Sequence, residues 1–197
     1  MTLSLILPMA TFALVSSISP GPVNLMCLSS GTRYPITSGL IFVTGASLGF
    51  IALFIGIGLG LYSLLTLMPG FNTLLRWAGI IFLLYLSLQL FRDNGMIPEN
   101  SPNHAPGFTT GAIMQWLNPK AWLASASGIG AYTNTGDLSQ VITFAAIYFP
   151  ICWLSLSCWV YAGAFLRRYV HRPAVLISIN RTLALLLAAS CLFLLIE

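Results

Sequence analysis

Apolar residues fill the chain in six long segments, which short stretches of polar residues, prolines and glycines separate. The segments run at about residues 3–31, 37–61, 73–91, 108–131, 139–165 and 174–196. A helix that crosses a bilayer needs about 20 mainly apolar residues, and each segment is close to that length or longer. The pattern therefore predicts an all-α integral membrane protein with six transmembrane helices.

The polar breaks divide the chain into two halves of three helices each. The longest break, residues 93–106, contains Asp-Asn-Gly, Ile-Pro-Glu-Asn and Ser-Pro-Asn, which are typical of turns and linkers. Because three spans precede this linker, the second half enters the membrane in the opposite sense to the first. We therefore expect a single transmembrane domain over residues 1–197, whose architecture permits an inverted repeat of about 1–92 and 107–197.

The composition excludes a water-soluble fold. Of the 197 residues, 57% are hydrophobic and only 6% are charged, and the mean hydropathy is +0.90. A soluble domain is typically about 25% charged, so these few charges could not cover a globular surface in water. The net charge of +4 therefore does not indicate a nucleic-acid partner. In a membrane protein it mainly reports which loops face the cytoplasm.

The arginines are distributed unequally between the loops. Loops two and four carry at most Arg76, whereas loops one, three and five carry Arg33, Arg92, Arg167, Arg168 and Arg172. Because cytoplasmic loops are enriched in Lys and Arg, the odd loops are expected in the cytoplasm and both termini outside.

Proline interrupts the first segment of each half. The interruptions read Ser19-Pro20-Gly21-Pro22-Val23-Asn24 and Leu117-Asn118-Pro119-Lys120-Ala121-Trp122. Because Ser and Asn favour the N-cap and Pro the first helical position, Ser19-Pro20 and Asn118-Pro119 predict two half-helices that start inside the bilayer. Their free N–H groups would bind an anion, such as a substrate carboxylate. A simple proline kink is the alternative.

Lys120 is the single lysine and lies at the centre of the fourth segment. A cation at the bilayer centre costs about 2.5–3.5 kcal/mol on insertion scales, so we expect it to face a partner or an aqueous cavity. The alternative is a re-entrant turn that leaves the side chain near the cytoplasmic surface. Asn24, Gln115 and Asn118 lie at similar depth and are expected to line the same cavity or to hydrogen-bond between helices.

The sequence lacks the motifs of an enzyme or a metal site. It contains no GxSxG, HExxH or P-loop motif, and its cysteines lack CxxC spacing. The acidic residues all fall at segment ends or in loops, at Asp93, Glu99, Asp137 and Glu197. No carboxylate pair is therefore expected in the membrane for acid–base chemistry, and we expect neither catalysis nor a bound metal.

Two further stretches accompany the proline motifs. Gly45 and Gly49 favour close helix packing, and Leu-Ser-Ser occupies residues 28–30. Together with the six segments and the proline motifs, these features resemble the LysE/RhtB family of bacterial amino-acid exporters, and most closely its cysteine/O-acetylserine exporter branch. The resemblance implies efflux of small neutral or basic amino acids across the inner membrane, driven by the proton motive force, without a bound cofactor.

The chain departs from this family at one position. Family members read Pro-Gly-Pro-Asp or Pro-Gly-Pro-Asn where this chain has Val23. Proton coupling or ammonium recognition through that side chain is therefore excluded, and the polar contact is expected to have moved to Asn24 or to have been lost.

The sequence thus predicts an exporter with a substrate site between half-helices that begin at Pro20 and Pro119. Their N–H groups and Lys120 would hold the carboxylate, and the amide side chains would contact the amino group or the substrate side chain. The predicted site residues are Ser19, Pro20, Gly21, Pro22, Asn24, Gln115, Asn118, Pro119 and Lys120. The oligomeric state is open, and so are two other classes of protein. One is a membrane thiol–disulfide carrier that uses Cys27 and Cys152; the other is a structural subunit without transport.

The arginine distribution predicts the topology. A reporter that is active only outside the cytoplasm should be active when fused after Glu197 and silent when placed within residues 93–106. The opposite pair of activities would reverse the predicted orientation.

Overall fold

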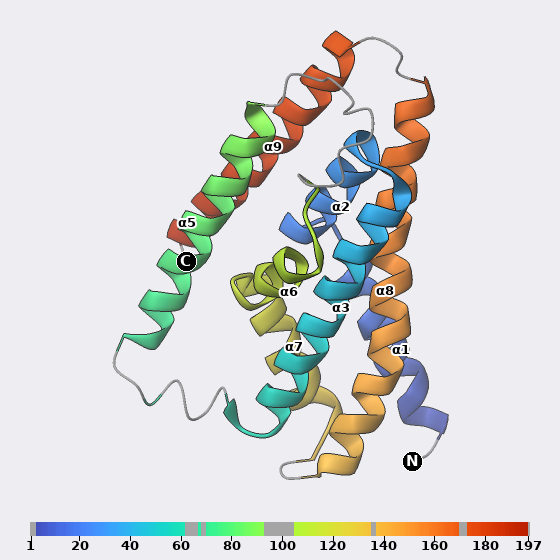
Figure 1. The fold of residues 1–197 in the computed structure, drawn as a ribbon. Helices are drawn as coiled ribbons and strands as arrows, with labels where there is room; N and C mark the ends of the chain where they lie inside the picture. Colours follow the sequence, from blue (N-terminus) through green and yellow to red (C-terminus); the bar gives the residue numbers. More distant parts are fainter. Residues whose placement is uncertain are drawn as a thin grey trace.

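The computed structural model describes residues 3–61, 67, 70–92, 105–134, 137–169 and 173–196, which form helices and no strand (Figure 1). The described helices of the first half are α1 (Leu3–Ile18), α2 (Pro22–Arg33), α3 (Ile36–Gly58) and α5 (Phe71–Phe91). Those of the second half are α6 (Phe108–Trp116), α7 (Pro119–Tyr132), α8 (Leu138–Tyr169) and α9 (Pro173–Ile196).

Each predicted apolar segment corresponds to one helix or to one broken pair of helices. The first and fourth segments are the pairs α1–α2 and α6–α7, and the others are α3, α5, α8 and α9. Among the described residues, α3 and α8 are long and apolar enough to cross a membrane, and α1 and α2 pass the same test together as a pair bent by 60°, which is either one broken span or a re-entrant loop. The all-helical membrane fold is therefore confirmed, while the count of six spans stays a prediction. Most of the predicted linker 93–106 lies outside the described residues.

The bundle is organised around α3 and α8, which contact each other along the molecule. α8 also packs along both halves of the first broken helix, α1 and α2, and α3 packs along both halves of the second, α6 and α7. α5 and α9 form an antiparallel pair at one edge, and they meet the rest of the bundle at α7 and α2 respectively (Figure 1). The two helix breaks therefore lie between the central helices and this edge pair.

Aromatic rings fill the core beside the first helix break. The ring of Tyr148 on α8 lies 4.6 Å from that of Phe50 and 5.4 Å from that of Phe54, both on α3. Phe144 packs edge-on against Phe54 at 5.0 Å, and Phe12 of α1 meets Tyr148 edge-on at 6.4 Å. Because offset and edge-on contacts fix ring orientation, this cluster holds α1, α3 and α8 together.

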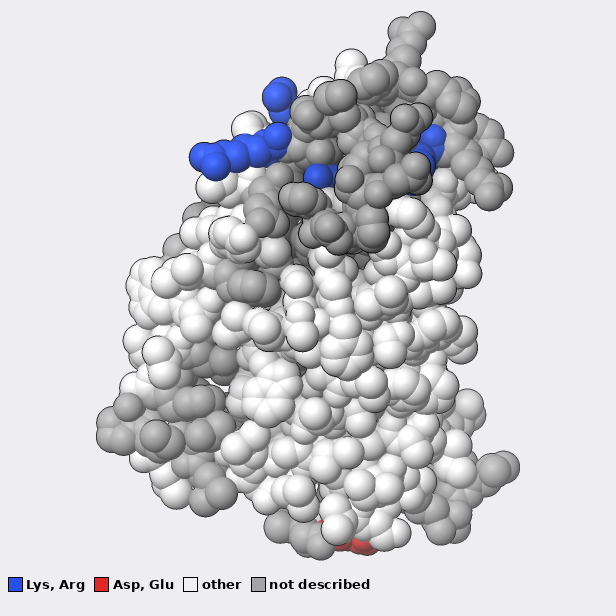
Figure 2. Space-filling model, in the orientation of Figure 1, with Lys and Arg blue, Asp and Glu red and all other residues white. Residues whose placement is uncertain are grey.

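Charged groups separate to opposite ends of the bundle. α2, α5 and α8 all end at the upper end in Figure 1, close to Arg33, Arg92 and Arg167, while Asp137 precedes α8 at the lower end. In Figure 2 the basic atoms gather on the upper part and the acidic atoms at the lower edge, with uncharged surface between them. These three arginines thus share one end, as predicted, and which side of the membrane that end faces stays a prediction.

Glycines bring the backbones of α3 and α6 into contact. A Cβ atom on Gly45 would collide with the carbonyl oxygen of Phe108, and one on Gly49 would lie 2.7 Å from the Cα of Ala112. The predicted close packing at Gly45 and Gly49 is therefore confirmed. It places the second helix break directly against α3.

Replacing Gly45 by Ala should lower the free energy of unfolding by about 1–3 kcal/mol, because the added methyl group meets backbone that cannot rotate away. The matched control is Gly130→Ala on α7, where a Cβ atom would meet nothing within 4 Å and the change should be neutral or slightly stabilising. Thermal unfolding of the purified proteins in detergent measures both. Equal melting temperatures for the two variants would contradict this packing.

Candidate functional site

The first helix break lies between Ile18 and Pro22. α2 begins at Pro22, and its N-cap is Gly21, whose extended backbone has φ −166° and whose position provides no side-chain cap. The prediction that this half-helix begins at Pro20, capped by Ser19, is therefore wrong by two residues. Ser19 still belongs to the end of α1, because its N–H donates to Val15 O at 3.2 Å and its hydroxyl to Ser16 O at 3.2 Å. The rule that places Pro at the first helical position is met by the second proline of the motif.

The second break follows the predicted pattern. α7 begins at Pro119, and the side-chain oxygen of its N-cap Asn118 accepts from the N–H of Lys120 at 3.1 Å. The backbone carbonyl of Asn118 accepts from the N–H of Ala121 at 2.9 Å. The first N–H groups of α7 thus already have partners, whereas no side chain caps the first turn of α2.

Side chains from three other helices satisfy the carbonyl groups at the end of α1. Such carbonyls have no partner within their own helix and carry partial negative charge. Asn24 on α2 donates to Ser17 O at 2.8 Å, and Trp159 on α8 donates to Ile18 O at 3.1 Å. These contacts hold the broken end of α1 in place between α2 and α8.

The third of these side chains is Lys120, which links the two helix breaks. Its ammonium donates to the backbone oxygen and to the hydroxyl of Ser19, each at 2.8 Å. It also passes over the start of α2, since a Cβ atom on Gly21 would lie 3.3 Å from Nζ. The expectation that Lys120 faces a polar partner is therefore met, whereas its depth relative to the membrane surfaces stays a prediction.

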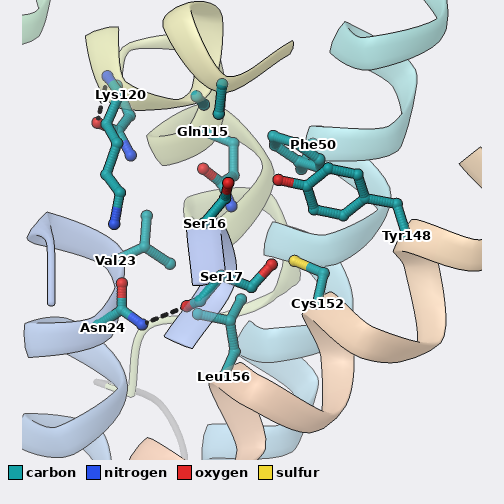
Figure 3. A pocket seen from close by; sticks show the side chains of 13 residues that line it. Ser16, Ser17, Val23, Asn24, Phe50, Gln115, Lys120, Tyr148, Cys152 and Leu156 are labelled. Atoms are coloured by element: carbon teal, nitrogen blue, oxygen red, sulfur yellow. Dashed lines mark hydrogen bonds between the residues drawn. The ribbon is translucent and has the colours of Figure 1, made fainter. Parts of the chain in front are cut away.

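A cavity of about 40 Å³ lies between the two breaks and α8 (Figure 3). Of the predicted site residues, Asn24, Gln115, Asn118 and Lys120 line it. The others lie outside the lining: Ser19 binds Lys120, and Pro20, Gly21, Pro22 and Pro119 belong to the interrupted backbone. The prediction missed the remaining lining residues, which are Ser16, Ser17, Val23, Phe50, Ala121, Ala124, Tyr148, Cys152 and Leu156.

Gln115 presents its amide to the cavity. The residue is only 6% exposed and lies in the lining. In Figure 3 the amide points from α6 into the space beside Ser16. An amide offers both a donor and an acceptor, so this side chain can bind water or a ligand in the cavity.

α8 supplies one whole wall of the cavity, which the sequence prediction did not identify. Tyr148, Cys152 and Leu156 are spaced by four residues and share one face of the helix. Cys27 and Cys152 are both buried free thiols, and among the described cysteines there is no disulfide.

The expected relocation of a polar contact to Asn24 fits the geometry, since Val23 and Asn24 both line the cavity while only Asn24 offers polar side-chain atoms.

A bundle of apolar helices with two broken helices around a buried polar cavity is the architecture of a secondary transporter. The chain belongs to the LysE type translocator family, whose pattern matches residues 14–197. It is therefore a transporter and not an enzyme.

The similar proteins include several cysteine/O-acetylserine efflux proteins. That of Klebsiella pneumoniae is 28% identical over 171 residues, which cover 85% of this chain and 86% of the relative. That of Escherichia coli O1:K1 is 27% identical over 197 residues, which cover 95% of each chain, and that of Salmonella typhimurium is 27% identical over 90% of each. No solved structure matches the chain. These comparisons confirm the family resemblance seen in the sequence.

The cap at the start of α7 predicts a stability difference between two variants. Asn118→Ala removes the side-chain acceptor for the N–H of Lys120 and should lower the free energy of unfolding by about 1 kcal/mol. Asn118→Ser keeps a capping oxygen and should lose only a few tenths of that. Thermal unfolding in detergent compares them, and equal losses for Ala and Ser would contradict the capping role of Asn118.

Proposed function

We propose that the protein exports small amino acids from the cytoplasm and that the substrate carboxylate binds between the Lys120 ammonium and the first turn of α2. Membership of a translocator family and likeness to proteins named for cysteine/O-acetylserine efflux support the export of amino acids. The single observation that carries the site is the position of Lys120, whose ammonium lies at both helix breaks and lines the cavity.

The carboxylate end of this proposal rests on the contrast between the two half-helices. The first turn of α2 has no side-chain cap, and Pro22 at its first position leaves the N–H groups of Val23 and Asn24 as the first available donors. A helix N-terminus favours anions, and the Lys120 ammonium lies beside it. At the start of α7 the Asn118 side chain already accepts from a backbone N–H group, so this N-terminus is the weaker candidate for binding the carboxylate. The carboxylate site proposed from the sequence therefore shifts towards α2.

The binding of the substrate amino group is argued from the Ser19 carbonyl group, to which Lys120 now donates. When a carboxylate attracts the lysine ammonium, the Ser19 carbonyl at the negative end of α1 becomes available to the amino group of the substrate. The side-chain oxygen of Asn24 lies nearby, since a Cβ atom on Gly21 would lie 3.3 Å from Lys120 Nζ and 3.6 Å from Asn24 Oδ1. A zwitterion would thus replace the contacts of Lys120 with Ser19 by two charge-assisted contacts, one at each end of the substrate.

The helix contacts support an inverted repeat and hence a site that opens to each side in turn. In such a repeat, the helices α1, α2, α3 and α5 correspond to α6, α7, α8 and α9. The contact between α3 and α6 then corresponds to that between α8 and α1, and the contact between α2 and α8 to that between α7 and α3. All four contacts are present. The α5–α9 and α3–α8 contacts convert into themselves. A site between equivalent broken helices is where alternating access is expected, and we propose the proton motive force as the energy source.

Efflux from preloaded cells tests the function. Labelled cysteine, O-acetylserine, serine, alanine and lysine would be followed with and without an uncoupler, at matched membrane levels of protein. We expect export of some of these compounds but not all, and an uncoupler should reduce it. Equal efflux of every compound, no greater than in cells without the protein, would overturn the proposal.

Lys120→Met tests the carboxylate site. It removes a charge-assisted contact worth about 1.5–3 kcal/mol, so the apparent substrate affinity should fall roughly ten- to a hundredfold. Lys120→Arg should lose less, since it keeps the charge but not its compact shape. The matched control is Arg181→Met, which removes an exposed cation that stacks on Phe91 in the edge pair and should transport normally.

Two outcomes would contradict this assignment. Normal affinity in Lys120→Met at equal membrane levels would remove Lys120 from the site. Loss of efflux in Cys27→Ser, with Lys120→Met unaffected, would instead favour the thiol–disulfide carrier.

A further inference from the structure

The wall of the cavity that faces Lys120 across Figure 3 consists of α8 residues to which the proposed carboxylate site assigns no role. Tyr148 and Cys152 both lie in the lining, and they are 1% and 3% exposed. In Figure 3 the Tyr148 hydroxyl points from α8 into the cavity toward Gln115 and Ser16, and the Cys152 sulfur points toward the Ser17 side chain. Polar atoms of these five residues thus converge on the side of the cavity away from the lysine.

Tyr148 cannot easily turn away from this position. Its ring is enclosed by Phe50 at 4.6 Å, Phe54 at 5.4 Å, Phe144 at 5.7 Å and Phe12 at 6.4 Å, measured between ring centroids. Rings packed in this way keep one orientation. The hydroxyl is therefore presented to the cavity by a rigid support, as a group that recognises a ligand should be.

The charges around the cavity restrict its contents. Among the residues that the structure describes, no acidic side chain lines the cavity, and Lys120 is the only basic one in the lining. A substrate side chain with its own positive charge would be buried without a counterion, which is strongly unfavourable. A side chain with a second negative charge would have to share the single lysine with the α-carboxylate. The cavity therefore favours a side chain without charge.

The size of the cavity and the chemistry of its walls further restrict the substrate side chain. The volume of about 40 Å³ corresponds to only a few water molecules, which favours a short side chain. The hydroxyl of Tyr148, the thiol of Cys152 and the amide of Gln115 offer hydrogen bonds, while Phe50 and Leu156 offer apolar contact. A hydroxyl, a thiol or a small ester matches both kinds of surface.

We infer that Tyr148 and Cys152 form the side-chain subsite of the exporter and select short, uncharged side chains that carry a hydroxyl, thiol or ester group. This inference rests on the proposed function and adds the residues that set its specificity. Tyr148 acts by donating a hydrogen bond to the substrate side chain, and Cys152 provides a small polarisable surface beside it.

The test compares efflux of two amino acids that differ by one hydroxyl group, serine and alanine. In Tyr148→Phe the ratio of serine efflux to alanine efflux should fall about three- to tenfold, the effect of one lost neutral hydrogen bond, while alanine efflux is retained. The matched control is Tyr161→Phe, which alters an exposed tyrosine of the same helix and should leave the ratio unchanged. The unmodified protein should export lysine at no more than the background rate.

A second pair of variants keeps the test independent of Tyr148. Cys152→Val preserves size but removes the thiol and should lower the serine to alanine ratio in the same direction, whereas Cys158→Val, at an exposed thiol of α8, should not. All variants are compared at equal membrane levels. The serine to alanine ratio separates the subsite from a structural role, because a distorted bundle would slow both amino acids alike.

Four results would overturn the inference. These are an unchanged ratio in both Tyr148→Phe and Cys152→Val, an equal loss for serine and alanine, lysine efflux as fast as serine efflux, and no efflux of any panel member by the unmodified protein. The last result would overturn the proposed function itself. The first three would leave export intact and remove only the specificity role of this wall.

Discussion

The end of α1 leaves backbone carbonyl groups inside an apolar bundle, and the way these groups are satisfied determines much of the surrounding structure. A helix that stops within a membrane protein must find partners for its last carbonyls from elsewhere in the protein. Here α2, α7 and α8 each send one side chain to them, and the contribution of α7 is the ammonium of Lys120. The single lysine of the chain is thus stabilised by the negative end of a helix.

This arrangement depends on several features far from the break. Lys120 reaches Ser19 only because α7 begins at Pro119, and that start depends on the Asn118 cap. The α6–α7 pair is held close by the glycine contacts with α3, and α1 is held by the aromatic rings of α3 and α8. The Lys120 ammonium therefore caps the end of α1 and lines the cavity, and its full positive charge is balanced by the partial negative charge of that helix end. A group that offers a full negative charge would compete with the carbonyl, and in the proposed site this group is the substrate carboxylate.

The sequence allowed both helix breaks to be located, because proline and its neighbours act locally. It also predicted that Lys120, Asn24, Gln115 and Asn118 share one cavity or bond between helices, since few polar groups lie so deep in the apolar segments, and all four line the cavity. The start of the first half-helix was misplaced by two residues because the motif contains two prolines, and either one satisfies the same local rule. Only the tertiary structure shows that Ser19 remains bonded to α1.

The α8 wall could not be predicted, for a more general reason. In a soluble helix the buried face is recognised by its apolar periodicity, but in a membrane both the lipid face and the packed face are apolar. The four-residue spacing of Tyr148, Cys152 and Leu156 therefore did not distinguish the cavity face of α8 from its other faces. The role of Asn118 was difficult to predict for a related reason. The preference for Asn at an N-cap predicts a helix N-terminus that could bind an anion, and it also predicts that the Asn side chain already binds the N–H groups there. The structure resolves this conflict by leaving α2, and not α7, without a side-chain cap.

The most direct test of the central claim uses the fact that the chain contains a single lysine. Protein labelled with ¹⁵N at the lysine side chain has one ammonium resonance, which reports on Lys120 alone. If the ammonium passes from the Ser19 carbonyl to the substrate carboxylate, adding an exported amino acid should shift this resonance in a saturable manner. The corresponding amino acid amide, which lacks the carboxylate, should leave it in place. A resonance that does not respond to any amino acid that the protein exports would contradict the role of Lys120 in binding.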